Sequence, residues 1–368
     1  MTTPQNDESL PFSFPVTVPN ITSVIDTGFV KLPYFDPKTD FERLIVVPVS
    51  KASAQQRAGR AGRIQPGRCY RLYTEQYLIK SMEQSTTPEI LRTNLTSFIL
   101  TLKALGVENI LAFSMMDLPG VDALSHGLES LYALGAIDNQ TNLTKLGVDM
   151  SAFPTEPRVS RMLLESLKEE CAWEALAVAS ALQVRSLFVK PRGGNRHQQQ
   201  QMDYEASMAQ LADPSGDHVT YANVVAEQDE RDMDKEECIE RFINYIALRR
   251  VMEIRNQLSK FLRKYGRVRG LGAASTEERS AAIRKCVTAG FFFNVAKLGN
   301  DGRYYTIRGK QSLLVTPSQS SIFHSHGTHS EYIVFGETHD GARGGIELQS
   351  VSSIDSRWLR ELAPHYWD

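Results

Sequence analysis

The chain has 368 residues, of which 41 are basic, 43 are acidic and 42% are hydrophobic, with a formal net charge of -2. This length leaves room for two or three domains, each with its own core. The balanced charge excludes a global positive field, so nucleic acid could be attracted only by local basic patches. No C-x-x-C pair occurs among the four cysteines, which argues against a disulfide framework or a zinc site and is typical of a reducing compartment.

Membrane insertion is also disfavoured. No apolar run approaches the roughly 18 residues that a bilayer-spanning helix needs, and the polar start Met1–Glu8 is unlike a signal peptide. We therefore expect a soluble intracellular protein without membrane contact. Residues 1–22 are rich in Pro, Ser, Thr and Asn and are expected to form an irregular lead-in.

Two short apolar runs, Ser23–Asp26 and Leu44–Val49, come next. Continuous runs of this kind predict strands covered on both faces, as in a parallel α/β sheet. The basic stretch Gln55–Arg63 begins soon after the second run. It thus follows the carboxyl end of a predicted strand, which is where open α/β sheets bind their ligands.

The basic stretch places Gln56, Arg57, Arg60 and Arg63 at near-helical spacing. On a helix, Arg60 and Arg63 would share a face, and paired guanidinium groups are suited to stabilising charge on a transferring γ-phosphoryl group. The alternative is a short solvated basic helix. Ala and Gly occupy the positions between the arginines, so the acidic partners of a solvated helix are missing. We therefore favour a phosphate-binding role.

The sequence around these residues is more specific still. Gln56–Arg63 reads QRAGRAGR, with Pro48–Gln55 before it and Pro66–Thr74 after it. These segments resemble motif six of the DEAH-box RNA helicases. The resemblance extends from about Val24 to the C-terminus and is closest to the spliceosome-associated members.

The resemblance implies an ATP-dependent RNA helicase that couples hydrolysis of ATP, with Mg as the metal cofactor, to 3′-to-5′ movement on RNA. Matched to the family motif, Gln56 and Arg60 would contact the γ-phosphate. Arg63 would act as the second arginine finger, and Arg57 would be structural.

Two motifs of a helicase motor do not occur in the sequence, namely the phosphate cradle G-x-x-x-x-G-K-[ST] and the acidic Asp-Glu-Ala-His. We therefore expect the first motor domain to be absent, the chain to hydrolyse no ATP alone, and the Mg ligands to come from elsewhere. No residue is assigned to a metal. Because two strands are too few for a stable sheet, residues 23–80 are expected to be poorly packed or to need a partner.

From Pro88 the apolar spacing becomes helical, with Gly106 and Gly135 at expected helix ends. The residues from Ala136 to Thr144 then predict a short hairpin, so helix, helix and hairpin indicate a winged helix. Its second helix is rich in Leu and poor in cations, which favours packing over nucleic-acid reading.

Further helices are predicted at 158–188 and 236–264, separated by a polar loop at 191–202 and by a turn at Gly216–Thr220 in which Asp217 or Thr220 caps a helix. Lys and Arg residues are concentrated in the second half of the helix predicted at 236–264 and in the loop that follows it. RNA contact and a solvated face are about equally supported by the residues, and the resemblance to the family's ratchet domain favours RNA. The predicted RNA-binding residues are Arg249, Arg250, Lys260, Arg263 and Lys264.

After a linker at 270–282, five short alternating runs predict a small barrel of the oligonucleotide/oligosaccharide-binding (OB) type. Phe291, Tyr304 and Tyr305 could stack on bases, but core packing is favoured. His324–His329 suggests zinc, yet no Cys or carboxylate stands nearby at ligand spacing, so a flexible loop is favoured. Trp358–Tyr366 is similar to the family's closing helix, a packing element.

The fold class is therefore α+β and multidomain. We expect an irregular lead-in at 1–22, a remnant of a RecA-like α/β domain at 23–84, a winged helix at 85–150, a helical ratchet bundle at 151–269 and an OB-fold β-barrel at 270–368. The resemblance implies RNA, a glycine-rich activator protein and spliceosomal components as partners, with mRNA splicing in the nucleus, or the cytoplasm as well. One alternative is a non-catalytic module that binds RNA or the activator; another is an incomplete version of a full helicase.

Overall fold

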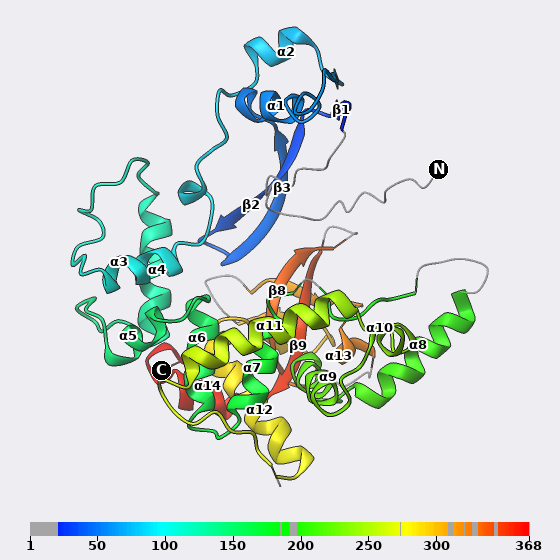
Figure 1. The fold of residues 1–368 in the computed structure, drawn as a ribbon. Helices are drawn as coiled ribbons and strands as arrows, with labels where there is room; N and C mark the ends of the chain where they lie inside the picture. Colours follow the sequence, from blue (N-terminus) through cyan, green and yellow to red (C-terminus); the bar gives the residue numbers. More distant parts are fainter. Residues whose placement is uncertain are drawn as a thin grey trace. The chain divides into compact units, whose positions relative to one another are not determined.

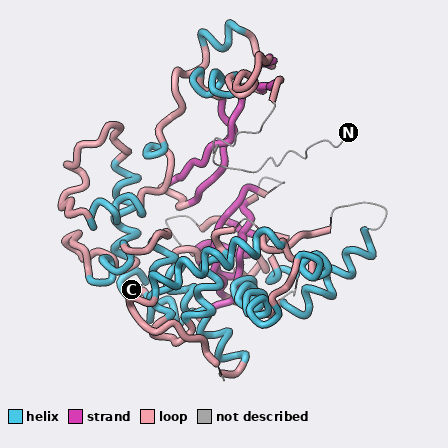
Figure 2. Tube along the Cα trace, in the orientation of Figure 1, coloured by secondary structure: helices cyan, strands magenta, loops and turns pink. Residues whose placement is uncertain are grey.

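The computed structural model describes residues 21–184, 186–191, 197–272, 274–307, 312–319, 321–325, 330–341 and 345–367. The chain divides into two compact units. The first contains the residues up to Leu95 together with Ser114–Ala123, and the second contains Thr96–Phe113 and Leu124–Asp368. Strands form two-stranded pairs in the first unit and a barrel in the second (Figures 1 and 2). Within the described ranges, every helix is too short or too polar to cross a membrane.

Two separate strand pairs make up the sheet structure of the first unit. β1 (Ser23–Asp26) pairs in parallel with β4 (Arg68–Arg71), and β2 (Phe29–Asp36) pairs antiparallel with β3 (Phe41–Pro48). The strand predicted at Ser23–Asp26 is present. The expectation that the second run is covered on both faces is wrong, because β3 folds back on β2 as a hairpin and most of its side chains are exposed.

The first unit has a small core. It consists of Val49, Ala54 and Met82, with three half-buried side chains packed against it. α1 (Lys51–Ala58) contributes Ala54 to this core, and α2 (Glu75–Lys80) contributes Tyr77 and Leu78, which pack against it. The short 3-10 helix η1 (Glu89–Leu91) follows in the chain. Large apolar side chains on the strands and on α2 remain exposed, among them Ile25, Leu72 and Ile79. This exposure supports the prediction of poor packing, while a RecA-like origin of the unit stays a prediction.

The next part of the chain, after Leu95, contains α3 (Thr96–Ala104), α4 (Val121–Ala133) and α5 (Lys145–Ser151). The helix expected from Pro88 starts later, since η1 and a turn come before Thr96. Gly106 and Gly135 adopt positive φ at the predicted helix ends. The predicted hairpin is reduced to one antiparallel bridge between Ile137 and Leu143.

The next helices in the chain are called the helical layer: α6 (Pro157–Ser166), α7 (Ala172–Ala181), α8 (His197–Leu211), α9 (Asp217–Arg231), α10 (Lys235–Glu240) and α11 (Tyr245–Leu262) (Figure 1). Of these, α9 contacts strand β9 (Ile346–Ile354) of the barrel. The single helix expected over 158–188 is broken, because Glu170 takes a left-handed conformation between α6 and α7. The helix expected over 236–264 is likewise divided, with Phe242 at positive φ and the Asn244 side chain capping α11.

Two smaller expectations in this layer also need correction. Residues 197–202 of the predicted polar loop belong to α8, whereas residues 192–196 lie outside the described residues. Ile239 and Ile246, two apolar residues of the helix predicted at 236–264, are 61% and 80% exposed. The break at Phe242 separates α10 from α11, and the buried face of α11 includes Leu248, Val251 and Leu258.

The predicted linker at 270–282 is mostly helix. α12 (Thr276–Phe291) starts at a capping box in which Ser275 and Glu278 bond each other's backbone N–H groups. The first of the five predicted strands begins only at Val295, because α12 continues through Phe291. The sequence contains the capping-box signal, Ser275 followed three residues later by Glu278. The small, polar residues around it favoured the linker interpretation.

The barrel confirms the five-stranded prediction. Its strands are β5 (Val295–Leu298), β6 (Tyr304–Thr306), β7 (Leu314–Pro317), β8 (Tyr332–Asp340) and β9 (Ile346–Ile354). They close in the order β5-β6-β7-β9-β8, with β7 and β9 parallel. α13 (Ile322–Ser325) lies between β7 and β8, and α14 (Ser356–Leu362) and α15 (Pro364–Trp367) end the chain. Tyr366 of α15 packs edge-on against Phe292 and Phe293, as expected of a packing element.

Asp217 joins the helical layer to the barrel, although the sequence predicted a helix cap. Its carboxylate accepts hydrogen bonds from Ser321 Oγ, Ile322 N and Val351 N, each at 2.7 Å. Gly216 is the N-cap of α9 and makes no side-chain cap. A Cβ on Gly216 would meet the Val351 carbonyl oxygen at 2.2 Å, so only glycine allows this close approach to β9.

His218 adds a second contact of the same kind. Its Nδ1 lies 2.8 Å from Ser352 Oγ on β9. Burial lowers the pKa of His218 to about 3 and raises the pKa of Asp217 to about 6. These two shifts have opposite effects on the pH dependence of stability.

The His218 shift gives a testable pH dependence. Because the pKa of His218 in the folded chain lies below the ordinary histidine value of 6.5, the neutral ring contributes stability that is present above pH 6.5 and is lost as pH falls towards 3. In His218→Gln the amide can still bond Ser352. We expect the stability advantage of the natural chain over this variant to shrink by about 1.4 kcal/mol per pH unit below 6.5. Urea unfolding at several pH values measures this, and an advantage that is constant with pH would contradict it.

Candidate nucleotide and RNA-binding sites

The arginine turn, residues 59–67, follows α1 directly. α1 begins at Ser50, whose side chain accepts from Ser53 N, and it ends at Ala58 with Gly59 as its C-cap. Arg60 and Arg63 therefore lie in turns beyond the helix, and the expectation that they share a helix face is wrong. Gly59, Gly62 and Pro66 explain this ending, since neither residue type favours continued helix.

The two ends of the arginine turn are in close backbone contact, at Ala61 and Gly67. A Cβ on Gly67 would lie 2.2 Å from the Ala61 carbonyl oxygen, so the returning chain touches the turn at a position that only glycine allows. Ala61 itself is buried. The segment that carries Arg60 and Arg63 is thus held at both ends, by α1 and by the contact with Gly67.

Arg57 forms an ion pair with Asp26. The sequence predicts Asp26 only as the last residue of a strand. Arg57 Nη1 lies 2.9 Å from Asp26 Oδ1, and Arg57 Nη2 donates to the Phe29 carbonyl oxygen at 3.1 Å. Tyr73 Oη and Gly28 N also donate to the Asp26 carboxylate, at 2.8 and 3.1 Å. This position of Arg57 agrees with the structural role that the motif resemblance implies.

The ionisation of this network follows from its contacts. Burial alone would raise the pKa of Asp26, but hydrogen bonds from Tyr73, Gly28 and Arg57 lower it below its usual value. Burial and the neighbouring Asp26 carboxylate raise the pKa of Tyr73 to about 12. A charged Asp26 therefore links β1, α1 and the end of β4. A lone carboxylate at the end of an apolar strand was the signal that could have identified it.

The predicted nucleotide-binding residues lie on two consecutive elements: Gln56 is in the last turn of α1, and Arg60 and Arg63 are in the arginine turn. Gln56 and Arg63 are exposed and Arg60 is half-buried. Arg60 Nη1 is shielded from solvent and has no hydrogen-bond partner within the described part of the chain. Because an unpaired buried N–H donor is costly, an anionic oxygen at this position would be favoured. The turn therefore fits a phosphate group.

The described residues do not provide a metal site beside the turn. Among the described residues, no group of three or more His, Cys, Asp or Glu side chains is arranged to hold a metal ion. Mg is therefore assigned to no residue of this chain. The side chains of His324, His326 and His329, in the segment where a zinc site was considered, lie outside the described residues.

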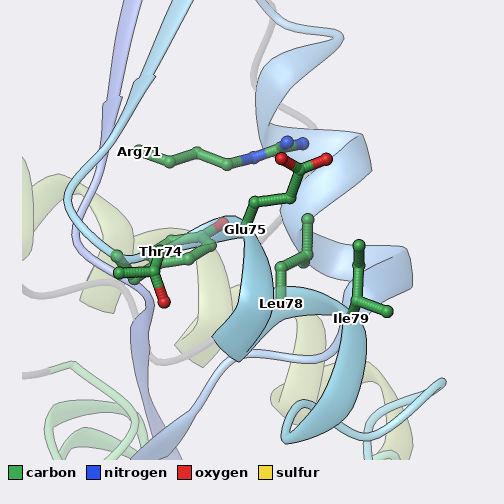
Figure 3. A pocket seen from close by; sticks show the side chains of 6 residues that line it. Arg71, Thr74, Glu75, Leu78 and Ile79 are labelled. Atoms are coloured by element: carbon green, nitrogen blue, oxygen red, sulfur yellow. The ribbon is translucent and has the colours of Figure 1, made fainter.

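A shallow pocket of about 250 Å³ lies between the end of β4 and α2, lined by Arg71, Tyr73, Thr74, Glu75, Leu78 and Ile79. In Figure 3 the guanidinium of Arg71 and the carboxylate of Glu75 point toward each other above Leu78 and Ile79. The volume is below the range of about 300–1,000 Å³ that is usual for small-molecule sites. We assign no ligand to this pocket.

The cationic face consists of the five predicted RNA-binding residues, Arg249, Arg250, Lys260, Arg263 and Lys264, on α11 and just after it. All five side chains are exposed. Glu253 forms an ion pair with Arg250 at 3.0 Å, and Lys264 Nζ lies 5.2 Å from the centre of the Phe261 ring. Since both partners of the Arg250 pair are solvent-exposed, the pair holds Arg250 only weakly.

Arg255 differs from these cations, although it lies among them in the sequence. It is buried, and its guanidinium donates to both carboxylate oxygens of Asp229 at 2.5 and 2.6 Å. The same group lies 4.2 Å from the centre of the Trp173 ring. Arg255 therefore joins α7, α9 and α11 and is not available to a ligand.

The three aromatic residues considered for base stacking, one at the end of α12 and two on β6, favour the core interpretation. Phe291 and Tyr304 are buried. Tyr305 is half-buried, and its hydroxyl donates to Asp301 Oδ2 at 2.8 Å. These contacts leave the cationic face as the stronger candidate for nucleic acid.

Three family models match the chain. Residues 127–155 match the winged-helix part of the helicase associated domain (HA2), residues 156–221 match its ratchet-like part, and residues 283–366 match the oligonucleotide/oligosaccharide-binding fold. The last match includes all five strands of the barrel. The boundaries of the domains predicted from the sequence stay a prediction.

Curated relatives extend the similarity into the first unit. Over 353 residues, 96% of this chain, it is 38% identical to the probable ATP-dependent RNA helicase DHX35 of Homo sapiens and to the same-named protein of Pongo abelii. The chain spans about half the length of these relatives, 48% and 47% respectively. Together, the three domain matches and this identity show that the chain belongs to the DEAH-box RNA helicase family and corresponds to a C-terminal portion of its members.

Proposed function

We propose that this chain is the part of an ATP-dependent RNA helicase that supplies arginines to the nucleotide and a cationic face to RNA. Arg60 supports this proposal most directly. Its Nη1 is a buried donor without an acceptor among the described residues, in a turn that lies between the end of α1 and the close contact of Gly67 with Ala61. A γ-phosphate oxygen would satisfy that donor, because phosphate is the anion that paired guanidinium groups bind best.

The proposed roles of Gln56, Arg60 and Arg63 come from the motif resemblance, and those of Asp26 and Arg57 are supported by their contacts. Bound ATP would supply a phosphoryl group on which negative charge develops during transfer to water. Arg60 and Gln56 would bind the γ-phosphate, and Arg63 would stabilise the developing charge. Asp26 would act through Arg57, because the ion pair fixes the end of α1 from which the arginine turn departs. Asp26 and Arg57 are therefore positioning residues.

RNA binding is assigned to the cationic face. A phosphate backbone releases counterions when cations approach it, so several exposed Lys and Arg side chains on one helix favour binding without reading sequence. This surface lies in the second unit, whose helical layer and barrel are joined by Asp217 and His218. The name of the relatives, RNA helicase, supports the same ligand. Splicing, a nuclear location and a glycine-rich activator stay proposals drawn from the family resemblance.

An assay of ATP hydrolysis tests the nucleotide part of the proposal. We expect the purified 368-residue chain to show no RNA-stimulated turnover, because a phosphate cradle ending in Lys-Ser/Thr and an Asp-Glu-Ala-His motif do not occur in its sequence. Exposed guanidinium groups alone contribute about 1 kcal/mol each to binding. RNA-stimulated hydrolysis that disappears in Arg60→Ala would contradict this expectation, since it would show that the chain is itself a motor.

A second candidate function is a non-catalytic module. The difference between the two units favours it: the second unit has a large core and a closed barrel, whereas the first exposes apolar side chains such as Ile25 and Leu72. A chain of this kind could bind RNA through the cationic face without turnover. Limited proteolysis separates the candidates, because a module would keep the second unit intact and bound to RNA after residues 23–80 are digested.

A further inference from the structure

Two cysteines that are far apart in the sequence meet in the core of the second unit. Cys171 precedes α7, Cys286 lies in α12, and their sulfur atoms are 3.2 Å apart across a separation of 115 residues. Both side chains are buried. Cys171 falls within the ratchet-like match and Cys286 within the match to the oligonucleotide/oligosaccharide-binding fold. The contact therefore connects two segments that are matched separately.

The separation of the sulfurs is short enough for a covalent bond after a small movement. A disulfide needs about 2.05 Å between its sulfurs, so each atom would have to move by roughly half an ångström. Rotation about the Cα–Cβ bonds of the two side chains changes this separation. Neither sulfur is bonded in the structure, where all four cysteines are free thiols.

We propose that Cys171 and Cys286 are a redox modification site, at which an oxidant of the peroxide class converts two thiols into a disulfide that joins α7 to α12. In the first step one sulfur attacks a peroxide oxygen, the O–O bond breaks, and a sulfenic acid and water are formed. The second thiol sulfur then attacks the sulfenic sulfur, the S–O bond breaks and a second water leaves. Two thiols and one hydrogen peroxide thus give one disulfide and two waters. This proposal does not depend on the proposed nucleotide and RNA sites.

The surroundings of the pair determine how fast it reacts. The hydrogen bond with Cys171, together with burial, holds the pKa of the Cys286 thiol well above its usual range. Because the thiolate is the reactive species, the closed pair resists oxidation at neutral pH. Oxidation therefore proceeds through brief openings of the core and is slow compared with that of an exposed cysteine.

The experiment uses the full purified chain and hydrogen peroxide. After oxidation, free thiols are blocked with iodoacetamide and the digest is mapped by mass spectrometry without reduction. We expect a linked peptide pair containing Cys171 and Cys286, lighter by two hydrogens than the separate peptides and released by dithiothreitol. The midpoint of thermal unfolding should rise by at least about 5 °C on oxidation, because the bond closes a long loop.

Variants make the assignment specific. Cys238→Ser is the matched control, because Cys238 is equally buried and burial also raises the pKa of its thiol. The linked peptide should persist in Cys238→Ser and disappear in Cys286→Ser. The proposal is overturned if, in the natural chain, Cys171 and Cys286 are still alkylated as free thiols after peroxide treatment and later denaturation. It is equally overturned if either cysteine is linked to Cys69 or Cys238 instead. Mapping the natural chain needs no variant to fold.

Discussion

Replacing Asp217 by alanine is expected to lower the free energy of unfolding of the second unit by about 3–5 kcal/mol. The carboxylate is buried and accepts three hydrogen bonds, from Ser321 Oγ, Ile322 N and Val351 N. Alanine leaves these donors buried without an acceptor. Each unpaired donor costs about 1–3 kcal/mol, less what a trapped water can recover. Urea unfolding followed by tryptophan fluorescence measures the change.

A matched control shows whether the cost comes from burial. Asp234 is the exposed N-cap of α10 and accepts from Glu236 N and Glu237 N. Asp234→Ala also removes a carboxylate from the start of a helix, and it should lower the free energy of unfolding by only about 1 kcal/mol. If both variants lose similar stability, Asp217 is an ordinary cap, as its sequence position first indicated, and the link between the helical layer and the barrel is not what stabilises the unit.

Much of the second unit was predictable because local signals decide it. Short alternating runs between Gly, Asn and Asp turns gave the five strands of the barrel, and Gly106 and Gly135 marked helix ends because a left-handed residue suits that position. The breaks at Glu170 and Phe242 were not predictable from periodicity. Neither residue type favours positive φ, so tertiary packing imposes these turns and no local pattern reports them.

Contacts between residues far apart in the sequence were also the part of the candidate sites that the sequence did not predict. The five residues of the cationic face were predicted as exposed cations on or just after one helix, since charge and helical spacing suffice for that. The burial of Arg255 by Asp229 and Trp173 depends on two other helices, and the ion pair of Arg57 with Asp26 spans 31 residues. Spacing along the chain carries no information on such contacts, although the ion pair agrees with the structural role of Arg57 that the motif resemblance implies.

Reversing three charges on the cationic face is expected to weaken RNA binding by roughly fifty- to a hundredfold near physiological salt. The variant is Arg249→Glu, Arg250→Glu and Lys264→Glu. These side chains are exposed, so the substitutions leave the core of α11 intact. The affinity falls because each lost phosphate contact removes counterion release, which supplies most of the free energy of binding that does not depend on sequence.

A second triple variant separates this effect from net charge. Lys145→Glu, Arg303→Glu and Arg360→Glu alter three exposed cations elsewhere in the second unit and change the net charge equally. This control should bind RNA within about threefold of the natural chain, since distant surface charges are largely screened at this ionic strength. Thermal unfolding of both variants checks that they are folded.

The most direct measurement is the salt dependence of binding of a fluorescent single-stranded RNA to the full chain, followed by anisotropy. For the natural chain, the logarithm of the affinity should fall linearly with the logarithm of the salt concentration. In the cationic-face variant the slope should be smaller by about 2, which corresponds to three lost phosphate contacts on a single strand. Equal slopes for the natural chain and this variant, or the same loss of affinity in the control, would contradict RNA binding along α11.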